Sequence, residues 1–309
     1  MSRNASAYVA ISAAILIWSH AFVAIKYCLR SVTPWELVIL RHVPAALVFG
    51  AYWVMYRRGD QFVRMVRADG WKFVVAGFVA VTAYHWPLNW GAARIPSGMT
   101  SLMVGMAPIF TFLVAALLIG ERPTWMKGGG ILLAFVGAYV CIRYGSGRDV
   151  DLTQLIGALV AMLATFLSSF YTVLGRRLAQ KYGALDFTAL TFTFGTIPIL
   201  FTVQPNLLAK LPALPWQFWA SDLFLGLGCT GTAHVLWNSG LEQIEATQVS
   251  AFLAILPLLG IVWGWLYLGE TLTAWLVLGG VMIVAGIAVT NRPKRKPLVP
   301  SVEAHAEVP

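Results

Sequence analysis

Residues 96–124 read PSGMTSLMVGMAPIFTFLVAALLIGERPT. From Ser97 to Ile119 this stretch holds no charged residue, and as a helix it is long enough to cross a hydrocarbon core about 30 Å thick. A proline, Pro108, lies inside the run, and Gly-Glu closes it. Residues 245–273 read EATQVSAFLAILPLLGIVWGWLYLGETLT and show the same small or polar start, inner proline and Gly-Glu end. The pattern predicts a membrane protein that contains a repeated unit.

The similarity between the two halves extends beyond these stretches at one fixed offset of 149 residues. This offset aligns identical residues of the two halves without a gap, and several of them are Gly, Pro or His. So many identities at a single offset rarely arise by chance. The identical pairs are His85/His234, Asn89/Asn238, Gly91/Gly240, Ile95/Ile244, Ser101/Ser250, Pro108/Pro257, Leu117/Leu266, Gly120/Gly269, Glu121/Glu270, Thr124/Thr273, Gly130/Gly279 and Gly137/Gly286. Before residue 83 the similarity is weak.

The composition and the apolar runs predict an all-α integral membrane protein. The chain is 59% hydrophobic and 11% charged, whereas a soluble domain carries about 25% charged residues. Ten windows are long enough to span a bilayer: 7–29, 34–56, 72–92, 97–119, 124–143, 153–178, 185–204, 216–240, 246–268 and 273–290. Since the offset covers five helices, an odd number, the second unit must insert upside down. We expect ten transmembrane helices as two inverted five-helix repeats, 1–143 and 153–290, followed by a disordered tail, 291–309.

The distribution of Lys and Arg predicts the orientation. If the N-terminus is cytoplasmic, fifteen of these residues lie in inside segments and five in outside segments. The positive-inside rule therefore places both termini in the cytoplasm of a multi-pass protein of the cell inner (plasma) membrane. The basic tail RPKRKP, residues 292–297, then acts as a cytoplasmic topology anchor near anionic lipid headgroups. No aromatic residues are interleaved with it, so we expect no nucleic-acid partner.

On the motifs at 96–124 and 245–273, the sequence resembles the drug/metabolite transporter superfamily in its ten-helix EamA-type branch. The resemblance covers nearly the whole chain. It implies two five-helix bundles around a central cavity, and it implies export or exchange of small metabolites, which in several characterised relatives are amino acids. The first helix in this family often reads Trp-Gly-Ser, whereas here it reads Trp18-Ser19-His20. That departure changes the lining of a helix expected near the substrate.

Few ionisable residues lie inside the predicted spans, and such residues are functional candidates by default. They are His20, Lys26, Arg41, His42, His85 and His234. Every Asp and Glu lies near a predicted helix end or in a loop, which argues against a carrier driven by a deep carboxylate. For Lys26, snorkelling or helix pairing competes with attraction of an anionic group. Arg41 either binds a carboxylate bidentately or caps carbonyls or pairs with Glu36.

The motif HWPLNWG at 85–91 and its twin HVLWNSG at 234–240 each place a histidine and an asparagine on one helix face. We interpret Asn89 and Asn238 as structural residues that hold the turns that follow. His85 lies deeper in its span, so we expect it to contact the substrate, while His234 is assigned a structural role.

Aromatic and small polar residues complete the candidate site. The candidate substrate-binding residues are Trp18, His20, Tyr84, His85, Trp86, Ser101, Tyr171, Trp237 and Gln248. Inner aromatic rings suit an apolar or aromatic group on a ligand if they face a cavity, and the alternative is that they face lipid or only pack. Pro108 and Pro257 each remove a helix hydrogen bond, so each is either a fixed kink or a hinge.

The favoured function is a secondary transporter of small metabolites, most of all amino acids, working outward by alternating access. No G-x-x-x-x-G-K-[ST] motif is present for ATP. The alternatives are an exporter or importer of another small metabolite, an intramembrane enzyme, or a channel. The enzyme reading is weak because no HExxH exists and the histidines come from opposite copies. We expect no cofactor and no metal; the partners are a small-molecule substrate and the lipid bilayer, with a homodimer left open.

Overall fold

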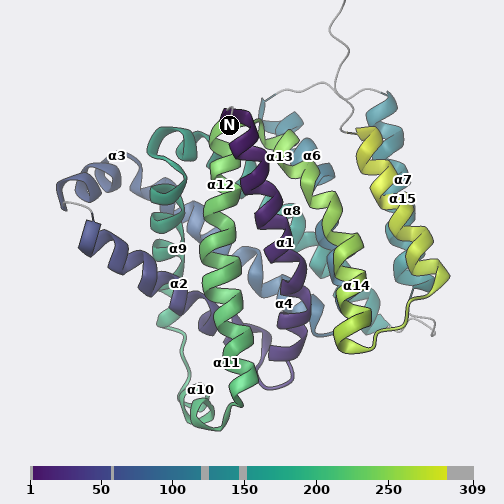
Figure 1. Ribbon diagram of the computed structural model, residues 1–309, viewed down its shortest axis with the longest axis horizontal. Coiled ribbons are helices and arrows are strands. Elements are labelled where there is room, and N and C mark those ends of the chain that lie inside the picture. Colours follow the sequence, from purple (N-terminus) through teal and green to yellow (C-terminus); the bar gives the residue numbers. More distant parts are fainter. Residues whose placement is uncertain (1–2, 57–58, 120–124, 146–151, 291–309) are drawn as a thin grey trace, which may run out of the picture.

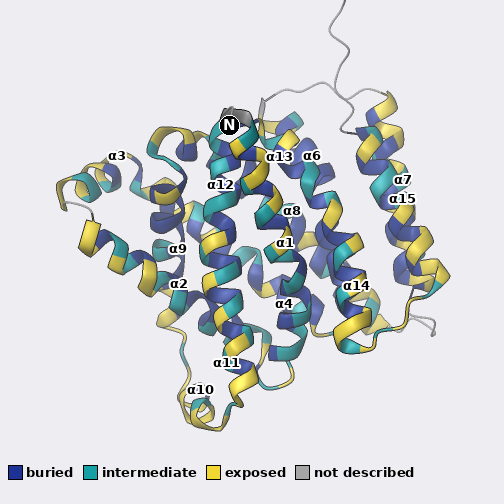
Figure 2. Ribbon diagram, in the orientation of Figure 1, coloured by how far each residue is buried: buried dark blue, intermediate teal, exposed yellow. Residues whose placement is uncertain are grey.

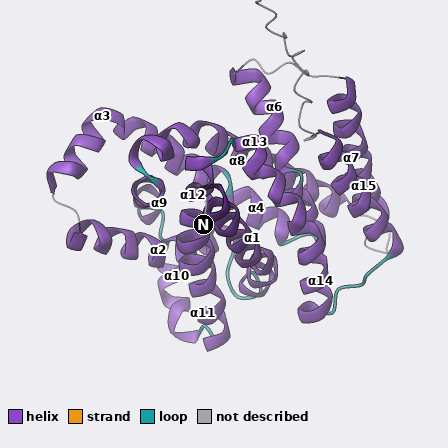
Figure 3. Ribbon diagram, turned by 45° about the horizontal axis from the view of Figure 1, so that its top comes forward, coloured by secondary structure: helices purple, strands orange, loops and turns teal. Residues whose placement is uncertain are grey.

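The computed structural model describes residues 3–56, 59–119, 125–145 and 152–290, and in this part of the chain all regular structure is helical (Figure 3). The predicted tail lies outside the described residues. Going along the chain, the helices are α1 (Arg3–Cys28), α2 (Pro34–Tyr56), α3 (Gly59–Gly77), η1 (Phe78–Ala83), α4 (His85–Ala92), α5 (Ser97–Gly105), α6 (Ala107–Ile119), α7 (Trp125–Tyr144), α8 (Leu152–Tyr182), α9 (Ala184–Leu200), α10 (Pro205–Lys210), η2 (Leu211–Ala213), α11 (Trp216–Leu223), η3 (Phe224–Ala233), α12 (His234–Gln243), α13 (Ala246–Ala251), η4 (Phe252–Ile255), α14 (Leu256–Leu268) and α15 (Ala274–Thr290).

Helical structure occupies each of the ten predicted windows, but within the described ranges fewer helices meet the length and hydropathy expected of a span. Six do so, and a seventh span results if α9 and the segment Pro205–Ala213, bent by 100°, count as one. The windows at 72–92 and 216–240 fall short because the π-helical segments η1 and η3 divide them. Helix α15 has 17 residues. The chain is thus a multi-pass membrane protein, while ten spans and their inversion stay predictions.

The equivalent helices of the two units, α7 and α15, lie side by side along one edge of the molecule (Figure 1). Glycines allow the two backbones to approach closely: a Cβ on Gly130 would lie 2.6 Å from the Gly286 carbonyl oxygen, and one on Gly137 would lie 2.7 Å from that of Gly279. Pairing of 130 with 286 and of 137 with 279 means that the helices run antiparallel. Four of the glycines that define the repeat are therefore explained by close helix packing.

A second antiparallel crossing joins α5 to α14. A Cβ on Gly105 would collide with the ring of Pro257, and one on Gly260 would collide with the side chain of Ser101. The helices break near the two prolines: α5 ends at Gly105 before Pro108, and the 3₁₀ segment η4 precedes Pro257. Proline has no amide hydrogen, and in the first turn of a helix that hydrogen would have no helical partner. Because the helices break just before the two prolines, no helix hydrogen bond is lost there.

The carboxylate of Glu270 caps the start of α5 from the other half of the chain. Its oxygens accept hydrogen bonds from Ser97 N (2.6 Å), Ser97 Oγ (2.9 Å) and Gly98 N (3.0 Å). The first turn of a helix has amide groups without helical partners and a positive dipole end, and an acceptor with a negative charge satisfies both. The Gly-Glu end of the second repeat stretch thus has a structural role.

Apolar side chains are exposed over much of the outer surface (Figure 2). Val54 is 86% exposed, Phe201 87% and Trp125 98%. In water such a surface would be costly, whereas lipid solvates it well. The distribution agrees with a chain that sits in a bilayer.

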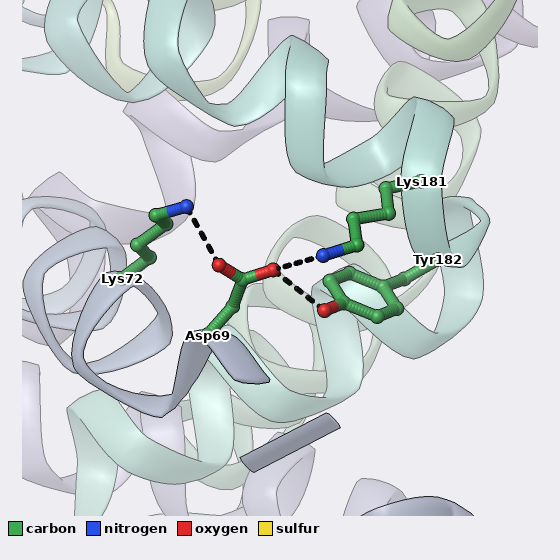
Figure 4. Close-up of polar contacts among 4 residues, drawn as sticks. All are labelled: Asp69, Lys72, Lys181 and Tyr182. Atoms are coloured by element: carbon green, nitrogen blue, oxygen red, sulfur yellow. Dashed lines mark hydrogen bonds and ion pairs between the residues drawn. The ribbon is translucent and has the colours of Figure 1, made fainter. Parts of the chain in front are cut away.

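A cluster of charges joins α3 to the end of α8 (Figure 4). The buried carboxylate of Asp69 accepts from Lys181 Nζ at 2.7 Å and from the Tyr182 hydroxyl at 2.6 Å, and it pairs with Lys72 Nζ at 2.6 Å. Lys181, then Lys72 and Tyr182, hold the pKa of Asp69 well below its usual value. Both ammonium groups are about half exposed, so the cluster lies at the edge of the protein and orients α3 against α8 without forming part of the interior.

Candidate functional site

A cavity of about 90 Å³ lies in the interior, and both halves of the chain form its walls. Helices α1, α2, α4, α5, α6, α8, α12 and α14 and the segments η1 and η4 all contribute. The lining residues are Trp18, Ala21, Phe22, Ile25, Arg41, Ala80, Tyr84, His85, Leu88, Val104, Ala107, Ser168, Tyr171, Thr172, His234, Trp237, Leu253 and Leu256. The walls are mainly apolar and aromatic, with few polar groups that could orient a ligand, as in many small-molecule sites.

The two repeat-related histidines are held in the same way. Nδ1 of His85 donates to the carbonyl of Ala80 (2.6 Å), and Nδ1 of His234 donates to the carbonyl of Cys229 (2.8 Å). Each acceptor lies five residues earlier, inside or beside a π-helical segment. Since a carbonyl only accepts, each Nδ1 carries the hydrogen. Both rings line the cavity, so His234, assigned a structural role from sequence, occupies a position like that of His85.

Aromatic rings from several helices line the cavity. Trp18 contacts the ring of His234 edge-on at 4.9 Å and that of Trp237 at 5.3 Å. Its Nε1 donates to the carbonyl of Cys229 at 3.0 Å, the same oxygen that His234 uses. Tyr84 contacts His85 edge-on at 4.6 Å. Of the aromatic candidates, Trp18, Tyr84, Tyr171 and Trp237 thus line the cavity.

The two asparagines connect helices to one another. Nδ2 of Asn238 donates to the Tyr171 hydroxyl (2.7 Å) and to Thr188 Oγ1 (2.8 Å), which connects α12 to α8 and α9. Nδ2 of Asn89 donates to the carbonyl of Pro34 at the start of α2, at 3.3 Å. Both are fully buried. Their hydrogen bonds run to neighbouring helices rather than to the turns that follow, and Asn238 also fixes the hydroxyl of a cavity residue.

Four of the sequence candidates do not reach the cavity. His20 stacks on Trp263 at 4.2 Å, Trp86 is 47% exposed, the Ser101 hydroxyl donates to Gly98 O at 2.7 Å, and Gln248 is exposed near the start of α13. Trp86 lies on the exposed side of α4, whereas its neighbour His85 is buried and lines the cavity. Ser101 lies at the crossing of α5 with α14, where a small side chain lets the two helices approach closely.

Arg41 on α2 is the charged member of the lining. It is 3% exposed, and its Nη2 reaches Thr230 Oγ1 at 3.3 Å and the carbonyl of Leu225 at 3.5 Å. Glu36, offered above as a partner, instead pairs with Lys210 at 2.8 Å. Lys26 donates to the carbonyls of Ala92 and Ile95, each at 2.9 Å. These two cations therefore differ: Lys26 is satisfied by backbone carbonyls and Arg41 is not.

Sequence reasoning missed other groups at the site. Ser168 and Thr172 line the cavity one helix turn apart on α8, on either side of Tyr171, and their i, i+4 spacing was the available signal. Asp222 is 1% exposed although it lies only two turns from a predicted helix start. Among the described residues, no group of three or more His, Cys, Asp or Glu side chains is arranged to hold a metal ion.

Comparison with known proteins gives a consistent result. A model of the EamA-like transporter family matches residues 5–143 and 155–292. An uncharacterized transporter of Archaeoglobus fulgidus is 29% identical over 92% of this chain and 98% of its own length. A probable terminal-alkyne amino-acid exporter of Streptantibioticus cattleyicolor is 28% identical over 90% and 91%, and the uncharacterized transporter YdfC of Bacillus subtilis is 28% identical over 93% and 92%.

A solved structure described as "Crystal structure of protein" is similar in fold. It matches with a TM-score of 0.65 and 22% identity, over 92% of this chain and 96% of that one. At this identity the match concerns the fold alone.

Proposed function

Because the chain belongs to the EamA-like transporter family of the drug/metabolite transporter superfamily, we propose that it exports amino acids across the cell inner membrane by alternating access. It is a membrane transporter; the cargo, the direction and the mechanism are the proposal. Both termini would lie in the cytoplasm, and the two halves would rock about the cavity as the site opens to one side and then to the other.

The observation that carries the proposal is a cavity built by both family-matched segments. Trp18, Arg41 and His85 come from the first segment, and Tyr171 and Trp237 from the second. A group bound between them contacts both halves, so its binding energy can bias their relative arrangement. The antiparallel contacts of α7 with α15 join equivalent helices of the two units, and those of α5 with α14 join the equivalent spans 97–119 and 246–268. Both contacts support an inverted pair of bundles.

The chemistry of the walls and one relative favour amino acids. The cavity is small, about 90 Å³, which suits a small metabolite and not a peptide or lipid. Aromatic walls suit an apolar side chain, and the buried polar groups can orient the polar end of the molecule. The relative from Streptantibioticus cattleyicolor is named as a probable amino-acid exporter, and we extend both cargo class and direction from it.

The test is counterflow in proteoliposomes. Purified protein is reconstituted, the vesicles are loaded with one unlabelled amino acid, and uptake of the same labelled amino acid is followed for a panel of twenty compounds. The proposal predicts transient accumulation for at least one amino acid that empty vesicles do not show. Absence of counterflow across the panel with folded protein would refute it.

A further inference from the structure

The guanidinium of Arg41 has hydrogen-bond donors without a partner in the part of the chain that the structure describes. Among these residues its buried Nε and Nη1 contact no acceptor, and its Nη2 makes two long contacts, with Thr230 Oγ1 at 3.3 Å and Leu225 O at 3.5 Å. A buried charge is costly unless it is paired and hydrogen-bonded. Within the described residues no carboxylate lies at ion-pair distance from it. Arg41 therefore lines the cavity with a charge, and two of its buried nitrogen donors lack a partner among these residues.

The neighbouring groups do not supply the missing partner. His42, His85 and His234 each direct Nδ1 to a backbone carbonyl, and a neutral imidazole carries no negative charge. Asp222 is near enough to interact electrostatically with Arg41, yet its Oδ1 forms no hydrogen bond. What the guanidinium lacks is an anion with two acceptor oxygens, and none of these side chains provides it.

We propose that Arg41 binds the carboxylate of the cargo, and that the site selects its cargo by this group and not by an ammonium group. The proposal rests on the function above, in that the cavity is taken as the cargo site. A guanidinium presents pairs of N–H groups that match the two oxygens of a carboxylate. Because Nε and Nη1 are both free, each of the two edges of the guanidinium that can bind a carboxylate in this way retains an unused donor.

The rest of the lining determines what the carboxylate is attached to. Trp18, Phe22, Tyr84 and Trp237 offer aromatic surface to an apolar group. No Asp or Glu is among the residues that line the cavity in the described part of the chain. An α-ammonium group thus finds no ion pair there. The cargo class is small organic monocarboxylates with an apolar or aromatic body, in which an amino group is tolerated and not required.

The experiment measures binding separately from transport. Purified full-length protein is titrated calorimetrically with phenylalanine, 3-phenylpropionate, phenylalaninamide and 2-phenylethylamine, and with the matching leucine set that includes 4-methylpentanoate and leucinamide. In at least one set the amino acid and its deaminated acid are expected to bind with similar affinity. The amide and the amine, which lack the carboxylate, are expected to bind roughly 10- to 100-fold more weakly, the range of a lost hydrogen bond to a charged group.

Variants assign the effect to Arg41. Arg41→Gln is expected to weaken binding of the acids by the same roughly 10- to 100-fold and to remove the preference for acids over amides. Arg41→Lys keeps the charge without the planar pair of donors and is expected to fall between. Lys26→Gln removes a second cation inside a span, which backbone carbonyls already satisfy, so it is expected to keep the preference. Each variant is compared by size-exclusion profile and thermal unfolding.

The outcomes separate this inference from the proposed function. Equal binding of acid and amide, or binding of phenylalanine and leucine without their deaminated acids, would overturn the inference even if counterflow succeeds. The same holds if no acid of either set binds the wild-type protein. If acids bind through Arg41 but no counterflow occurs, the transport proposal fails and the inference stands. If Arg41→Gln does not fold, the wild-type comparison of acid with amide and the Arg41→Lys variant still decide.

Discussion

Glu270→Ala should destabilise the protein because it removes a cap that links the two halves. Three hydrogen bonds of 2.6–3.0 Å are lost at the start of α5. Loss of a helix cap costs about 0.5–2 kcal/mol, and loss of a negative charge near the helix start costs about 0.3–1 kcal/mol more. Since Glu270 is partly exposed, we expect a total of about 1–3 kcal/mol, or a Tm lower by about 2–10 °C.

The assay is thermal unfolding of the detergent-purified protein, followed by tryptophan fluorescence. Glu270→Gln keeps one acceptor oxygen and should lose about half as much. Glu245→Ala is the matched control, because Glu245 is also a carboxylate at the start of a helix, α13, but its exposed side chain makes no cap hydrogen bond. If Glu270→Ala unfolds at the same temperature as Glu245→Ala, the reasoning about this cap is wrong.

Three further predictions address other parts of the structure. Asp69→Asn should loosen the cluster with Lys181; since the pKa of Asp69 is lowered, its contribution to stability is present above the unfolded-state pKa and is lost as the pH falls through the folded-state pKa, so wild type and variant should converge in Tm under strongly acidic conditions alone. Gly137→Val should force α7 away from Gly279 and cost about 1–3 kcal/mol in unfolding experiments; an unchanged Tm would contradict the packing argument. His85→Ala should impair counterflow while the protein stays folded, and unchanged counterflow would remove this ring from the site.

The helical architecture could largely be predicted from the sequence, because apolar runs and a fixed 149-residue offset locate helices directly. The π-helical interruptions of these helices could not be predicted. A π-helical segment such as Phe78–Ala83 changes the helical repeat too little to alter an apolar run, so the windows gave no sign that α4 begins at His85. These divisions account for two of the predicted windows that do not qualify as spans; α9 and α15, with 17 residues each, are shorter than a full span.

A residue that lines the cavity could be predicted from the sequence where its depth in the predicted span was sufficient, as for His85 and Tyr171. It could not be predicted where the direction of its side chain determined whether it reaches the cavity. Trp86 is 47% exposed although its neighbour His85 is buried, and Gln248 lies at the exposed start of a helix. The lack of an ion-pair partner for Arg41 among the described residues could be seen only in the structure. The sequence offered Glu36 as a partner, whereas in the structure Glu36 pairs with Lys210.

Access to the cavity from both sides of the membrane is the most direct test of the account. Ser168 lines the cavity, and the three native cysteines, Cys28, Cys141 and Cys229, are buried and can be replaced by alanine. In that background Ser168→Cys is treated in oriented vesicles with a membrane-impermeant thiol reagent, applied outside or trapped inside, with and without a transported amino acid. Alternating access predicts modification from each side and slower modification when cargo is bound. Modification from one side alone under every condition, or from neither, would contradict it.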